Sequence, residues 1–127
     1  MDELAARVSA ALGVDADVAR TAIGLVLGFL QEESPDGAVA ELLDKLPGAR
    51  ETIASAESAG GGGGGLGGLM GGMGGLMGLG AKLSGAGIAM NQIPKLGHEI
   101  FAYAEAEIGP EKLREIIDSV PGLAQFV

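Results

Sequence analysis

Glycine dominates the middle of this chain. Fourteen of the twenty-one residues from Gly60 to Gly80 are glycine, and the other seven are all leucine or methionine. A flexible spacer normally mixes glycine with serine and other small polar residues. Here the interspersed side chains are large and apolar, so the segment must bury them within the protein or bind another surface through them.

On a helix, the leucines and methionines of this segment fall on steps of three and four residues, and the glycines form a bare opposite face. Each helical glycine costs about 1 kcal/mol relative to alanine, so the fourteen together cost roughly 10 kcal/mol or more. Such a helix forms only if packing offsets that cost. The side chains predicted to form an interaction surface are Leu66, Leu69, Met70, Met73, Leu76, Met77 and Leu83.

Three structures are compatible with the segment. A packed helix would associate through its glycine face, because small residues four apart, such as Gly67 and Gly71, let two backbones approach closely. The second possibility is a disordered linker that remains adhesive through its apolar side chains. The third is membrane insertion, since the stretch from Gly60 to Ala81 carries no charge and is long enough to span a bilayer. So many glycines make such a span weakly hydrophobic.

The rest of the chain shows helical spacing of apolar residues, and no segment alternates as a half-buried strand would. The stretch 15–33 is apolar nearly all round, so we predict that it is the central helix. Gly24 and Gly28 give that helix a groove in which another backbone can come close. The other predicted helices cover residues 3–12, the stretch after Ser34-Pro35-Asp36, a weak one near 49–56, the stripe from Ile93 to Ile108, and the stretch after Gly109-Pro110.

The two ends of the chain resemble each other. Residues 41–48 align without a gap to residues 115–122 at an offset of 74, including the acidic residues and the closing Pro-Gly. The same offset relates Phe29 to Tyr103. We therefore predict an internal repeat in which 85–127 is related to 11–53.

The predicted fold is all-α: a small helical bundle built from two related helical hairpins joined by the Gly/Leu/Met-rich segment. The hairpins would face each other within one chain or pair between chains. The corresponding division is an N-terminal helical arm (1–59), the glycine-rich segment (60–84) and a C-terminal helical arm (85–127). Each arm is marginal in size alone, so we expect the arms to share one core or to dimerise.

The net charge of −9 disfavours nucleic acid as a partner, because binding there depends on Lys and Arg at phosphates. The chain has no cysteine and a single histidine, His98. His98-Glu99 begins like a zinc-protease helix, but a second histidine would have to stand at Ala102, so we predict a solvent-facing side chain. The carboxylates that cluster at helix junctions indicate a solvated surface rather than a cation site: Glu32, Glu33 and Asp36, and Glu105, Glu107 and Glu111.

The sequence also resembles a known family. The resemblance rests on Ala11-Leu12-Gly13-Val14-Asp15, on the glycine tract, and on the stretch from Ile117 to Phe126. In these the chain resembles small bacterial helical proteins with a glycine-rich middle, the VcgC/VcgE-like domains of unknown function. The resemblance implies a bacterial, helical, non-catalytic protein and carries over no active-site residue.

These observations predict a structural or interaction protein, not an enzyme, that uses no cofactor or metal. It would self-associate or bind a protein partner through the glycine-rich Leu/Met segment. The alternative is a membrane-associated protein that uses the same segment. The acidic start, Met1-Asp2-Glu3-Leu4, lacks the basic region of a secretory signal, so we expect a cytoplasmic protein.

Amide hydrogen exchange across residues 60–90 separates the possible structures of the segment. A packed helix should slow exchange of its amides well beyond the rates of an unstructured peptide, because the amides are hydrogen-bonded and shielded. Exchange at unstructured-peptide rates throughout the segment would contradict the packed helix and support the linker.

Overall fold

The computed structural model describes residues 2–33, 38–60 and 75–119. Seven α-helices and one short 3-10 helix account for the regular structure of these residues, and the same residues contain no β-strand. The predicted all-α helical bundle is confirmed at this level. The elements are α1 (Asp2–Leu12), α2 (Ala16–Glu33), α3 (Ala38–Lys45), α4 (Ala49–Gly60), α6 (Gly75–Ala86), η2 (Met90–Gln92), α7 (Ile93–Ile108) and α8 (Pro110–Ser119).

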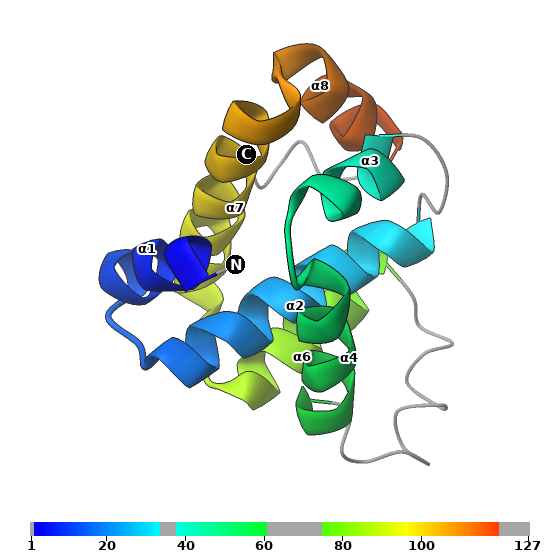
Figure 1. Ribbon diagram of the computed structural model, residues 1–127. Coiled ribbons are helices and arrows are strands. Elements are labelled where there is room, and N and C mark those ends of the chain that lie inside the picture. The colour runs from blue at the N-terminus through cyan, green and yellow to red at the C-terminus, as the bar shows by residue number, and fades with distance from the viewer. Residues whose placement is uncertain (1, 34–37, 61–74, 120–127) are drawn as a thin grey trace.

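Helix α2 is the centre of the bundle (Figure 1). It contacts α1, α3, α4, α6 and α7. Its buried residues include Leu25 and Val26 as well as Gly24 and Gly28, so neighbours cover it on several sides. A helix that is apolar nearly all round is stable only when it is covered in this way. The prediction of a central helix over 15–33 is confirmed.

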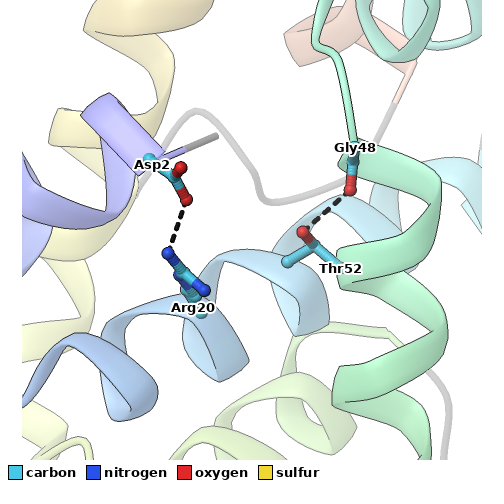
Figure 2. Close-up of polar contacts among 4 residues, drawn as sticks. All are labelled: Asp2, Arg20, Gly48 and Thr52. Atoms are coloured by element: carbon cyan, nitrogen blue, oxygen red, sulfur yellow. Dashed lines mark hydrogen bonds and ion pairs between the residues drawn. The ribbon is translucent and has the colours of Figure 1, made fainter.

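The closest helix packing joins α2 to α4. A Cβ atom placed on Gly24 would lie 2.5 Å from the Thr52 carbonyl oxygen and 2.5 Å from the Ala56 Cβ. Any side chain at position 24 would therefore collide with the backbone of α4. The hydroxyl of Thr52 points into its own helix, where Oγ1 donates to the Gly48 carbonyl oxygen at 2.8 Å (Figure 2). The predicted backbone groove is confirmed at Gly24.

Helix α4 is longer and more extensively packed than the sequence suggested. It begins at Ala49, ends at Gly60 and forms the most extensive helix pair of the bundle with α2. Its buried residues are Ala49, Ile53 and Ala56, of which two are small. Small residues give a weak periodic signal, yet they are the ones that fit against a glycine face.

Glycines with positive φ follow several of the helices. Gly13 follows α1 with φ of 69°, and Gly87 follows α6 with φ of 112°. Residues with a Cβ rarely adopt such angles, so glycine is the preferred residue at both stops. Pro94 lies in the first turn of α7, where its missing N–H leaves no bond unmade.

Residues 2–60, which we call the N-half, and residues 75–119, the C-half, share one hydrophobic core. Helix α1 of the N-half packs on α7 of the C-half as well as on α2, and α6 of the C-half packs mainly on α2 of the N-half. Figure 1 shows α1 beside α7, and α6 beside α2 and α4. The sequence also predicted that the two helical hairpins are copies of one repeat, and this stays a prediction.

The predicted helix start at Ser34-Pro35-Asp36 and the closing Pro121-Gly122 lie outside the described residues.

Gly24→Ala should lower the free energy of unfolding by about 1–3 kcal/mol, because the new methyl group overlaps the backbone of α4. The matched control is Gly85→Ala on α6, where a Cβ has no neighbour within 4 Å. That control should be neutral or stabilising by up to about 1 kcal/mol, since alanine is the better helix former. Urea denaturation measures both changes, and equal effects of the two substitutions would contradict the packing described here.

Candidate interaction segment

The last part of the glycine-rich segment is helical. Helix α6 begins at Gly75 and therefore includes the end of the tract. Of the predicted interaction residues, Leu76, Met77 and Leu83 lie in α6, and for the first two the structure describes the backbone alone. The remaining four lie outside the described residues: Leu66, Leu69, Met70 and Met73.

The side chain of Leu83 belongs to the core of the bundle. It is fully buried, and Leu79, four residues earlier on the same face, is 8% exposed. Helix α6 packs on α2 and also contacts α4. Leu79 was not among the predicted residues, although its spacing of four from Leu83 was the signal that could have identified it. The side chains of Leu79 and Leu83 therefore belong to the protein's own interior.

Burial of these two leucines accounts for the formation of a glycine-containing helix. Four of the twelve residues of α6 are glycine, which costs about 4 kcal/mol relative to alanine. Burying Leu79 and Leu83 contributes about 1.5–3 kcal/mol each, or about 3–6 kcal/mol together. The two terms are of similar size, so α6 depends on its contacts with α2 and α4.

A glycine-based cap defines the end of α6. The Ile88 N–H donates to the Leu83 carbonyl oxygen at 2.9 Å, and the Gly87 N–H donates to the Ser84 carbonyl oxygen at 3.2 Å. This pair of bonds, with Gly87 in a left-handed conformation, is the Schellman arrangement. Ile88 and Leu83 are both buried in the core, which fixes the exit of the chain from the helix.

Over residues 81–85, the face of α6 opposite Leu83 consists of small and polar residues. Ala81, Lys82, Ser84 and Gly85 are all exposed. Ala81 and Gly85 lie four residues apart, directly opposite Leu83 on the helix. A Cβ at Gly85 would have no neighbour within 4 Å. Glycine is therefore not required at this position by any contact among the described residues.

The side chains considered for metal or acid–base chemistry are dispersed on the surface. His98 is exposed on α7, and the described carboxylates of the two acidic clusters are exposed as well. Across residues 2–33, 38–60 and 75–119, no group of three or more His, Cys, Asp or Glu side chains is placed to hold a metal ion. Asp36 lies outside these residues.

Comparison with protein-family models, with curated proteins and with solved structures finds no match. The resemblance to the VcgC/VcgE-like family therefore stays a prediction. Among the described helices, none is both long enough and apolar enough to cross a membrane.

Leu83→Ala should lower the free energy of unfolding by about 2–5 kcal/mol, because it leaves a cavity in the core beneath α6. Lys82→Ala, at an exposed neighbouring position, is the control and should change stability by less than about 0.5 kcal/mol. Thermal or urea unfolding measures both. A change below about 1 kcal/mol for Leu83→Ala would show that α6 is not held by this side chain.

Proposed function

We propose that this chain is a non-catalytic structural protein that associates with further copies of itself through its glycine-rich Leu/Met segment. The residues assigned to the contact are Leu66, Leu69, Met70, Met73, Leu76 and Met77, together with the small-residue face of α6. Leu83 supports the contact from inside the bundle by holding α6 in place.

The observation that carries this proposal is the division of α6 into two faces. Leu79 and Leu83 are buried on α2, while Ala81 and Gly85 face outward four residues apart. A small residue at every fourth position lets a second helix approach to backbone contact. An exposed helical glycine destabilises the free protein, and a close intermolecular contact gives a physical reason for its presence.

The same chain already uses this kind of contact internally. At Gly24, the missing side chain of α2 brings the backbone of α4 within van der Waals distance. Packing at a glycine face is thus compatible with the stability of this bundle. The proposal extends the same geometry to an intermolecular contact at α6.

The remaining parts of the proposal follow from composition. A net charge of −9 with dispersed bases is poorly suited to nucleic acid, so the partner is a protein surface, first of all another copy. We place the protein in the cytoplasm and assign it no cofactor. Association with a bilayer through the same residues is the alternative, and no feature of the described helices favours it.

Met73→Glu should reduce self-association at least about tenfold, because a charge replaces an apolar side chain in the contact. Light scattering after size exclusion, over a range of protein concentrations, measures the association. Gly63→Glu is the matched control, since it adds the same charge to the segment without removing an apolar side chain. A wild-type protein that stays monomeric, or one whose association is unaffected by Met73→Glu, would contradict the proposal.

A further inference from the structure

The N-half and the C-half exchange helices. Helix α1 begins the N-half and packs on α7 of the C-half, and to nearly the same extent on α2 of its own half. Helix α6 begins the C-half but packs mainly on α2 of the N-half. The first helix of each half therefore contacts the long helix of the other half, and these two contacts between the halves are reciprocal.

The sequences of the exchanged helices match. Residues 4–11, Leu-Ala-Ala-Arg-Val-Ser-Ala-Ala, align with residues 79–86, Leu-Gly-Ala-Lys-Leu-Ser-Gly-Ala, at an offset of 75. All eight pairs are identical or conservative. The repeat predicted from sequence had an offset of 74 and began at residues 11 and 85, in the last turns of these helices. One extra residue, Leu12, shifts the alignment and concealed the match.

The junctions between the halves involve one pair of corresponding positions. The Gln92 Nε2 at the start of α7 donates to the Leu12 carbonyl oxygen at the end of α1, at 2.7 Å. In the other half, Val18 at the start of α2 lies beside Gly87 at the end of α6, with its Cγ1 3.5 Å from the position of a Cβ. The offset of 74 carries Val18 to Gln92. Both residues therefore lie against the end of the other half's first helix, although one makes a hydrogen bond and the other an apolar contact.

Two ion pairs join the halves. Arg7 of α1 lies 3.7 Å from Glu99 of α7, measured from Nη2 to Oε2. Lys112 of α8 donates to Glu41 of α3. That hydrogen bond holds the pKa of Glu41 below its ordinary value and the pKa of Lys112 above its own, so both groups stay charged across the neutral range. Both pairs lie at the surface, where they select partners more than they add stability.

From this arrangement we propose that a second copy of this chain can occupy the interface between the halves. The N-half of the first molecule then packs on the C-half of the second, and the N-half of the second packs on the C-half of the first. The result is a closed, domain-swapped dimer. The halves are linked in the chain through the fourteen residues 61–74, which can extend to roughly 46–50 Å. This dimer uses the core interface rather than the outer face of α6, and it is independent of the proposed function.

The exchanged dimer and the closed monomer contain the same contacts between halves. The ratio of exchanged dimer to closed monomer therefore depends on the protein concentration. Dimers are favoured when that concentration approaches the effective concentration of one half near the other within a single chain, which is on the order of mM for short linkers. Exchange requires the halves to separate, so dimers should form when the chains are unfolded and refolded together at high concentration. They should then persist on dilution.

Charge reversal across the interface tests the proposal with the full chain. One variant combines Arg7→Glu with Glu41→Lys, both in the N-half, and the other combines Glu99→Arg with Lys112→Glu, both in the C-half. Each variant alone has two like-charged pairs between its halves. In the mixed exchanged dimer all four pairs are of opposite charge, and neither variant changes the net charge of the chain.

After refolding together, the mixed dimer should exceed either homodimer by at least about tenfold, because four repulsive pairs become attractive. Native mass spectrometry measures the proportions. The first variant refolded with wild-type chain is the control and should show no such preference. If the variants fold only when mixed, the proposal is also supported, since each then completes the other.

Association through the glycine-rich segment, in contrast, would give random proportions, with the mixed dimer about twofold over each homodimer. That result would support the proposed function and overturn the exchange. A second experiment uses the wild-type chain, in case neither variant folds. Chains with and without an isotope label are refolded together at concentrations up to mM, and dimers that contain one chain of each kind are measured. The absence of mixed dimers in that experiment would also overturn the exchange.

Discussion

Burial of α2 is the constraint on which the rest of the structure depends. A helix with leucine, isoleucine or valine on nearly every side cannot remain at a surface, so other helices must cover it. Helices α1, α4 and α6 all pack against it. One of them, α6, belongs to the other half of the chain. The central helix therefore determines that the two halves form one core, because neither half covers it alone.

Glycine has two opposite roles in this bundle. At Gly24 it allows the backbone of α4 to pack against α2, and any side chain there would collide with Thr52. At Gly85 it weakens a helix without permitting any contact among the described residues. Both are helical glycines; Gly24 lies within an apolar stretch, and Gly85 follows Ser84 near Lys82. Spatial neighbours decide whether a glycine stabilises the protein by close packing or destabilises it by its conformational freedom.

The sequence predicted much of the fold because long periodic stripes carry strong signals. The central helix, the helix from Ile93 to Ile108 and the first helix, predicted over 3–12, are confirmed. Helix α4 was underestimated, since its buried face is mostly alanine and depends on a glycine in a distant helix. The inward position of Leu79 was missed. For the tract itself, periodicity could list the apolar residues but could not show which of them face the core, because that depends on α2.

The placement of α4 and α6 bears on how the bundle would respond to mechanical load. Helix α4 ends at Gly60, helix α6 begins at Gly75, and both helices pack on α2. Tension applied to the intervening residues would be divided between two helices that are held by the same central element. Detachment of either helix would uncover part of α2, so both ends of the intervening residues are attached to the same buried surface.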